Sequence, residues 1–182
     1  MKGNFETCLT EILLHEGGFV NHPSDPGGMT NLGVTKATYE SWIGYPVNEA
    51  IMRKLTPQLV KPLYRKKYWD MVRGDDLPTA LDLCVFDFAV NAGPGRAVRY
   101  LQRMVGCNAD GIMGPKTVSF TQQFCQENRY AHAVIHYQDR RREYYKQLPT
   151  FKTFGRGWLR RVSEVEKVAI RMIKNSNLDV KI

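Results

Sequence analysis

The 182-residue sequence lacks several features that would assign it to common classes of protein. No stretch reaches the roughly 20 consecutive apolar residues of a membrane-spanning helix. Glu6 and Glu11 interrupt the N-terminal apolar residues and no small-residue cleavage site follows, so this segment does not resemble a signal peptide. Internal repeats and low-complexity linkers are also missing, which excludes solenoids and loosely tethered domains. We therefore expect one continuous, globular chain.

Cysteine and histidine patterns typical of metal sites are missing too. None of the cysteines forms a CxxC pair, which argues against a zinc ribbon and favours reduced, buried thiols; they are Cys8, Cys84, Cys107 and Cys125. His132 and His136 have the spacing of helical metal ligands, but no HExxH motif or acidic cluster accompanies them. The sequence predicts no metal and no cofactor.

Positive charge is in excess, with a formal net charge of +8 and a pI near 9.4. A basic protein is attracted to polyanions such as nucleic acid, anionic membranes or acidic wall polymers. No nucleic-acid recognition motif or glycine-rich phosphate loop is present, so we predict no nucleic-acid partner. Arg140 to Arg142, with Arg160 and Arg161, make the C-terminal half basic. They are either a contact surface for an anionic wall or outer membrane, or a solvated helix face.

The hydrophobic pattern predicts a mainly α-helical fold. Apolar residues at helical spacing indicate a first helix from Phe5, which stops at Gly17-Gly18. The polar, turn-rich segment that follows, to Thr35, predicts a loop with a small β-hairpin near residues 19–35. Helices resume from Lys36.

The second half of the pattern gives the expected domain boundary. Thr56-Pro57 is a good helix start, opening a helix through Trp69, and Leu77-Pro78 opens the most apolar helix of the chain. The sequence AGPG after Asn91 breaks that helix, so we place a boundary between domains 1–92 and 93–182. In the second domain we expect an amphipathic helix after the break, a helix from Pro115, a long helix of about 126–147 and a last helix of about 157–175.

Glu16 is the first candidate for chemistry. It follows Ile12 by four residues and Leu13 by three, so it lies on the apolar face of the first helix. Desolvation and the negative end of the helix dipole both disfavour a carboxylate there. A carboxylic acid that stays protonated near neutral pH can donate a proton to a glycosidic oxygen. The alternative is an exposed residue at a frayed helix end.

Asp25 and Thr30 follow Glu16 by nine and fourteen residues, in the expected hairpin region. A second carboxylate across a sugar ring can activate water or stabilise an oxocarbenium-like transition state, and a hydroxyl can help to hold that water. Asp25 could instead form an Asx turn before Pro26, and Thr30 could be an ordinary strand residue.

A long composite motif narrows these alternatives. The segment HEGGFVNHPSDPGGMTNLGVT, from His15 to Thr35, resembles the signature of the glycoside hydrolase family 108 muramidases, which are similar to phage endolysins. LYRKKYWD and FDFAVNAGPGRAVRYLQ resemble later parts of the same domain. DGIMGPKT and GRGWLRRV resemble the small peptidoglycan-binding module that usually follows it.

The resemblance implies a lysozyme-like helical catalytic lobe and a compact helical C-terminal lobe that binds peptidoglycan. It implies hydrolysis of the β-1,4 bond between N-acetylmuramic acid and N-acetylglucosamine, with Glu16 as the catalytic acid. The spacing of Asp25 and Thr30 is similar to the Glu-Asp-Thr triad of phage-type lysozymes, but one residue shorter before Thr30. If that analogy holds, Asp25 positions water and the reaction inverts the anomeric centre.

Three further residues are candidates for substrate binding. Trp69 could stack on a sugar ring, or it could be a core residue. Asp87 and Asn91 lie four apart on one face of the most apolar helix, where they could bind N-acetyl groups or form a satisfied buried network.

Two other functions remain open from the sequence. A lytic transglycosylase breaks the same bond without water and needs no second carboxylate, so Asp25 discriminates against it. A noncatalytic wall-binding or export-accessory protein would suit the binding module but not the retained Glu16. For the muramidase we expect a monomer, made in a bacterial host cytoplasm, that reaches the wall or periplasm after holin-type release.

Overall fold

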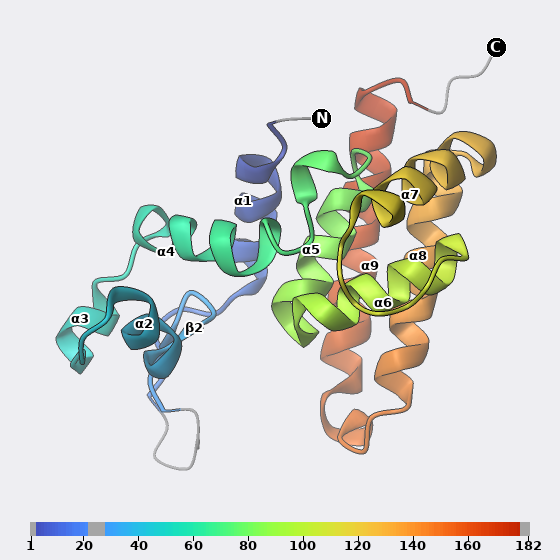
Figure 1. The fold of residues 1–182 in the computed structure, drawn as a ribbon. Coiled ribbons are helices and arrows are strands. Elements are labelled where there is room, and N and C mark those ends of the chain that lie inside the picture. Colours follow the sequence, from blue (N-terminus) through green and yellow to red (C-terminus); the bar gives the residue numbers. More distant parts are fainter. Residues whose placement is uncertain (1–2, 22–27, 179–182) are drawn as a thin grey trace. The chain divides into compact units, whose positions relative to one another are not determined.

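The computed structural model describes residues 3–21 and 28–178, and these residues form nine α-helices and one two-stranded antiparallel sheet (Figure 1). The prediction of a mainly α-helical, lysozyme-like fold with a small hairpin is confirmed. Contacts divide the chain into two compact units, a smaller one of Leu9–Lys67 and a larger one of Met1–Cys8 with Tyr68–Ile182. The elements are, in order, α1 (Phe5–His15), β1 (Thr30–Asn31), β2 (Val34–Thr35), α2 (Lys36–Ile43), α3 (Glu49–Arg53), α4 (Pro57–Tyr64), the π-helical turn η1 (Arg65–Trp69), the 3-10 turn η2 (Gly74–Asp76), α5 (Leu81–Ala92), α6 (Pro94–Val105), α7 (Pro115–Asn128), α8 (Tyr130–Lys146) and α9 (Phe151–Asn175).

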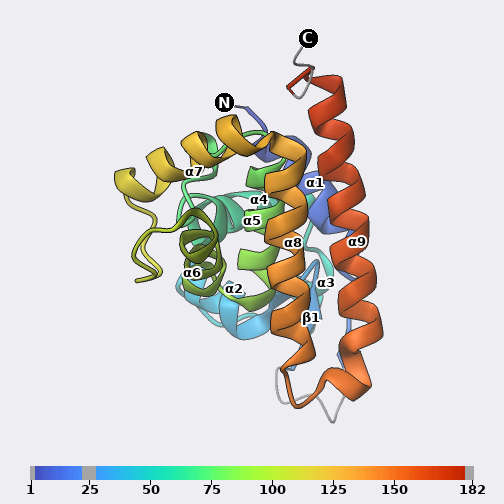
Figure 2. The same cartoon turned by 90° about the vertical axis from the view of Figure 1, so that its right-hand side faces the viewer.

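The larger unit is built around α5. Every residue of this helix from Leu81 to Ala89 is buried, which explains why its sequence is mostly apolar, with Asp82 and Asp87 as the exceptions. Helices α6, α8 and α9 all pack against it, and α8 and α9 lie side by side along most of their lengths (Figure 2). The core of this unit therefore sits where α5 meets these three helices.

Two helix boundaries in the larger unit differ from the sequence prediction. The expected long helix of about 126–147 begins at Tyr130 instead. The helix from Pro115 continues to Asn128, and Arg129, with a φ of +65° that an α-helix cannot continue, separates the two. The last helix begins at Phe151 rather than near Gly157. Gly155 lies inside it against the Phe151 ring, where a Cβ would come within 2.5 Å of ring carbons, so this glycine serves close packing instead of ending a helix.

The smaller unit contains the C-terminal part of α1, the hairpin and three short helices with polar N-caps. The Thr35, Asn48 and Thr56 side chains accept hydrogen bonds from backbone N–H groups in the first turns of α2, α3 and α4. The predicted helix from Thr56-Pro57 through Trp69 is present, but its last turn is π-helical. Helix α4 is the element that carries Tyr64 to the hairpin.

Candidate active site

The hairpin turns at Leu32 and Gly33, and both residues have positive φ values, of 50° and 71°. Positive φ at both central residues is the pattern of a type I′ turn, which matches the twist of the strands it joins. Glycine adopts this backbone freely, whereas leucine does so at a cost. The turn is therefore held in shape by its surroundings.

The chain leaving α1 pairs with this hairpin. Val20 and Thr30 exchange two backbone hydrogen bonds, of 2.8 and 2.9 Å, and Leu32 N–H donates to the Gly17 carbonyl at 3.2 Å. The residues directly after Glu16 are thus bound to the hairpin, so the end of α1 and the turn are kept close together.

Two side chains fasten the hairpin to the helices of the smaller unit. The buried Asn31 amide donates to the Met52 carbonyl in α3 at 2.8 Å. The Tyr64 hydroxyl, at the end of α4, donates to the Leu32 carbonyl at 2.9 Å. Tyr64 is only 1% exposed, so its hydroxyl is fixed by packing as well as by this hydrogen bond.

The Glu16 carboxyl group lies against the turn. A Cβ at Gly33 would stand 2.6 Å from Glu16 Oε2 and 2.5 Å from the Tyr64 hydroxyl oxygen. The Glu16 carboxyl group and the Tyr64 hydroxyl therefore both lie next to the position where any residue other than glycine would carry its Cβ. Glu16 itself directly follows α1, is half-buried, and keeps a helical hydrogen bond to the Ile12 carbonyl. This arrangement holds the carboxyl group of a half-buried residue in a defined position.

The roles of the other two predicted catalytic residues, Thr30 and Asp25, stay predictions. Thr30 is the first residue of β1, half-buried, on the strand that leads into the Leu32–Gly33 turn. The hairpin brings its backbone to the segment that follows Glu16, and the role of its hydroxyl stays a prediction. Asp25 lies outside the described residues, so its role also stays a prediction.

Trp69 belongs to the core of the larger unit. It is 0% exposed, lies 5.4 Å from Phe5 and 5.1 Å from Phe86 between ring centroids, and donates its indole N–H to Asp75 at 3.2 Å. A fully buried indole has no face for a sugar ring. The structure therefore corrects the stacking hypothesis and assigns Trp69 to core packing.

Asp87 is likewise enclosed. Both its oxygens face arginines, with Arg141 Nη2 at 2.6 Å and Arg161 Nη2 at 2.7 Å. Burial raises the pKa of the Asp87 carboxyl, but the two guanidinium groups outweigh it and hold the pKa below its usual value. With no exposed surface, Asp87 cannot bind an N-acetyl group, so the buried-network alternative holds. Asn91 is exposed, and its amide donates to the Asp87 carbonyl at 2.7 Å.

Neither a metal cluster nor a membrane span is found in the part of the chain that the structure describes. Across residues 3–21 and 28–178, no three His, Cys, Asp or Glu side chains group in a way that could hold a metal ion. None of the described helices is long and apolar enough to cross a membrane. All four cysteines are free thiols, and burial raises the pKa of the Cys84 thiol well above its usual value.

Comparisons with known proteins assign the chain to a family. The family model Glycosyl hydrolase 108 matches residues 9–93, and the model Predicted Peptidoglycan domain matches residues 96–163. The solved structure of Brucella abortus SagA is 40% identical, with a TM-score of 0.84, and the match covers 98% of this chain and 100% of that one. No curated protein matches significantly. Fold and matches together define a glycoside hydrolase that acts on peptidoglycan. The chain belongs to the glycosyl hydrolase 108 family.

Sequence reasoning missed two residues beside Glu16. Gly33 and Tyr64 lie seventeen and forty-eight positions after it. Both fall within segments that resemble the family, HEGGFVNHPSDPGGMTNLGVT and LYRKKYWD, but neither was singled out as a site residue. One signal was present for Tyr64, because it falls at helical spacing from Val60 in a helix with a clear N-cap, which predicts a buried position. The sequence does not reveal that Tyr64 contacts Leu32, because this contact forms only when the hairpin folds against α4.

Proposed function

We propose that this protein is a muramidase that hydrolyses the β-1,4 bond between N-acetylmuramic acid and N-acetylglucosamine, with Glu16 as its general acid. The observation that carries the proposal is the placement of the Glu16 carboxyl group against Gly33 and Tyr64. A general acid must be held within hydrogen-bond reach of the leaving oxygen, so a carboxyl group held in place on a half-buried residue suits the role. Family membership supplies the glycosidase class and the peptidoglycan substrate.

Tyr64 supports the same role through the direction of its hydrogen bond. Because its hydroxyl proton is directed to the Leu32 carbonyl, the lone pairs of the oxygen remain for other neighbours. A lone pair beside Glu16 can accept a hydrogen bond from a protonated carboxyl group. Tyr64 is thus a positioning residue for the acid form of Glu16, which is the form that donates a proton to the glycosidic oxygen.

The second half of the proposed reaction uses water. We propose that Asp25 activates the attacking water and that Thr30 helps to hold it, so that the anomeric centre is inverted. Support for Asp25 comes from its spacing to Glu16, which is similar to that in phage-type lysozymes. Support for Thr30 is its place in β1, on the strand that leads into the turn beside Glu16.

The decisive experiment compares the wild type with Glu16→Gln on purified peptidoglycan, with circular dichroism as a check of folding. The substitution is nearly isosteric and removes the acid proton, so we expect activity to fall by about two or more orders of magnitude. Glu11→Gln, a half-buried position earlier in α1, is the matched control and should stay active. Equal activity of Glu16→Gln and the wild type would reject the assignment.

Product analysis by mass spectrometry tests the reaction type. A hydrolase leaves a reducing N-acetylmuramic acid end, whereas a lytic transglycosylase leaves an anhydro end. We expect reducing ends, and loss of activity in Asp25→Asn. Anhydro products from an enzyme that tolerates Asp25→Asn would replace the hydrolase with the transglycosylase.

The biological role is proposed from the same family likeness. We propose an endolysin in which residues 1–92 cleave the wall and residues 93–182 bind it, active on the wall after holin-type release. This boundary between residues 92 and 93 separates proposed functions and not separately packed structures, because Asp87 on one side of it pairs with Arg141 and Arg161 on the other. In a bacterial host that expresses the chain, lysis should depend on a co-expressed holin. Lysis without a holin would reject this route.

A further inference from the structure

Several of the arginines that make the C-terminal half basic in the sequence are paired with acidic residues in the structure. Arg141 is fully buried against Asp87, and Arg161, with 13% of its side chain exposed, pairs with the same carboxylate. Arg142 pairs with Asp139 at 2.7 Å and with Glu166 at 2.9 Å. Most of the basic cluster seen in the sequence is therefore used inside the protein.

Another set of cations, all on α9, is exposed. Neighbouring members are three or four residues apart, or seven where Glu164 lies between them, which places them on one face of the helix. Residues buried in the core, such as Val162, Val165 and Ala169, lie on the opposite face. We call the exposed set the α9 cationic face; it consists of Lys152, Arg156, Arg160, Lys167, Arg171 and Lys174.

These charges are largely uncompensated. Within the described part of the chain, Arg160 is the only one of the six that forms an ion pair, with Glu164 at 3.9 Å. At such a distance, and with 77% of the Arg160 side chain exposed, the pair is weak. An unpaired row of like charges on one helix face is destabilising by itself, so it is a candidate for an external anionic partner.

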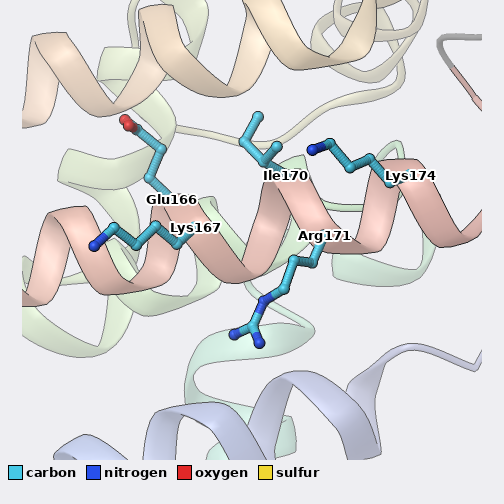
Figure 3. Close-up of a pocket in the computed structure, with 5 residues that line it drawn as sticks. All are labelled: Glu166, Lys167, Ile170, Arg171 and Lys174. Carbon is cyan, nitrogen blue, oxygen red and sulfur yellow. The ribbon is translucent and has the colours of Figure 1, made fainter.

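The C-terminal end of the face is hollowed. A hollow of about 510 Å³ is lined by five side chains from one stretch of α9, namely Glu166, Lys167, Ile170, Arg171 and Lys174 (Figure 3). Glu166 is its one acidic group, and Arg142 already neutralises it. The lining therefore includes three cations and the apolar side chain of Ile170. Lys174 points toward Ile170, whereas the Arg171 guanidinium points away from it (Figure 3). This combination suits a carboxylate carried on a short peptide.

We propose that the α9 cationic face binds the free carboxylates of peptidoglycan stem peptides. From Lys152 to Lys174 the face extends over roughly 33 Å, at about 1.5 Å per residue. A wall polymer repeats its carboxylates, so several can be engaged at once and weak contacts add up to useful avidity. Lys167, Arg171 and Lys174 lie beyond residue 163, where the match to the peptidoglycan domain ends, so the wall-binding surface extends past that segment.

The test measures sedimentation of the full-length chain with purified peptidoglycan over a range of salt concentrations. All proteins carry Glu16→Gln and are assayed in the cold, so that binding is read without cleavage. The triple variant Lys167→Gln, Arg171→Gln, Lys174→Gln should bind about tenfold more weakly at low salt and show a shallower salt dependence. A control triple variant, Arg103→Gln, Arg129→Gln, Lys146→Gln, removes the same charge from exposed positions outside α9 and should bind like the Glu16→Gln parent.

Chemically modified walls separate this proposal from a general effect of charge. Walls whose carboxylates are capped as neutral amides should bind the parent only as weakly as untreated walls bind the α9 triple variant. The proposal is overturned by equal weakening in both triple variants, by unchanged binding of the α9 variant, or by full binding to capped walls. It is also overturned if the α9 variant loses binding only to vesicles of anionic phospholipid. The assay measures binding without cleavage. It therefore tests the α9 cationic face even if the muramidase proposal fails.

Discussion

Gly33 lies so close to Glu16 that no side chain fits between them, since a Cβ on Gly33 would stand 2.6 Å from Oε2 and 2.9 Å from Cδ of the carboxyl group. The same Cβ would meet the Tyr64 hydroxyl at 2.5 Å. Gly33 is therefore needed twice, once for a backbone φ of +71° and once for the space that the carboxyl group occupies. The two needs can be separated by experiment.

Gly33→Ala should lower activity at least about tenfold and also lower stability by about 1–2 kcal/mol, because the methyl group displaces the Glu16 carboxyl and strains the turn. Gly44→Ala is the matched control. Gly44 has a similar φ of +86°, at the end of α2, but a Cβ there would meet no atom within 4 Å. The Gly44→Ala variant should lose stability through backbone strain and keep its activity. Wall-lysis rates and urea denaturation measure the two effects, and a Gly33→Ala variant as active as Gly44→Ala would show that the space beside Glu16 is not needed.

Tyr64→Phe keeps the buried ring and removes the hydroxyl that binds the Leu32 carbonyl. We expect a stability loss of about 1 kcal/mol from the lost hydrogen bond. We also expect kcat to fall several-fold with little change in KM, because a positioning residue acts on the transition state more than on substrate binding. Tyr45→Phe, at an exposed tyrosine of the same unit, should change neither constant. A rise in KM with unchanged kcat would assign Tyr64 to substrate binding instead.

Asp82 gives the larger unit a specific dependence on pH. Burial raises the pKa of its carboxyl to about 6 from 3.8, although hydrogen bonds from the Asn4 amide and the Leu83 N–H favour the charged form. The folded state therefore holds this proton more tightly than the unfolded state does. Its contribution to stability is fully present below about pH 4 and is lost as the pH rises through about 6.

The Asp82→Asn variant isolates this effect. Between pH 4 and pH 7 the wild type should lose on the order of 2–3 kcal/mol relative to Asp82→Asn, which has no proton to release at this position. Denaturant unfolding of both proteins across this range measures the difference. A constant gap between the two curves would mean that the buried carboxyl titrates near its ordinary value in the folded protein.

The sequence predicted the helices and the hairpin better than it predicted which residues contact one another in the folded chain. Helical periodicity and N-caps located most helices, and the turn-rich segment predicted the hairpin, because these signals are local. The boundary between α7 and α8 was expected near residue 126 and lies at Arg129, because a single arginine with positive φ carries no sequence signature. Trp69 and Asp87 were candidates for substrate binding because residue type alone does not reveal burial. Tyr64 was missed because its contact with Leu32 joins segments 32 residues apart.

The buried ion pairs of Asp87 predict a large loss of stability when this residue is replaced. Asp87→Asn would leave Arg141, which is fully buried, without its counter-charge, and would weaken the hold on Arg161. Breaking such a buried pair typically costs about 3–5 kcal/mol, far more than the loss of a surface pair. Asp139→Asn removes an exposed partner of Arg142 and should cost less than about 1 kcal/mol.

The pH dependence of Asp87 runs opposite to that of Asp82. Its pKa is lowered in the folded state by the two arginines, so its contribution is present above the unfolded value and is lost only as the pH falls through the folded one. The stability gap between wild type and Asp87→Asn should therefore stay constant from pH 8 to about pH 5 and narrow only in stronger acid. A gap that already narrows between pH 7 and pH 5 would show that the buried arginines do not hold the carboxylate in its charged form.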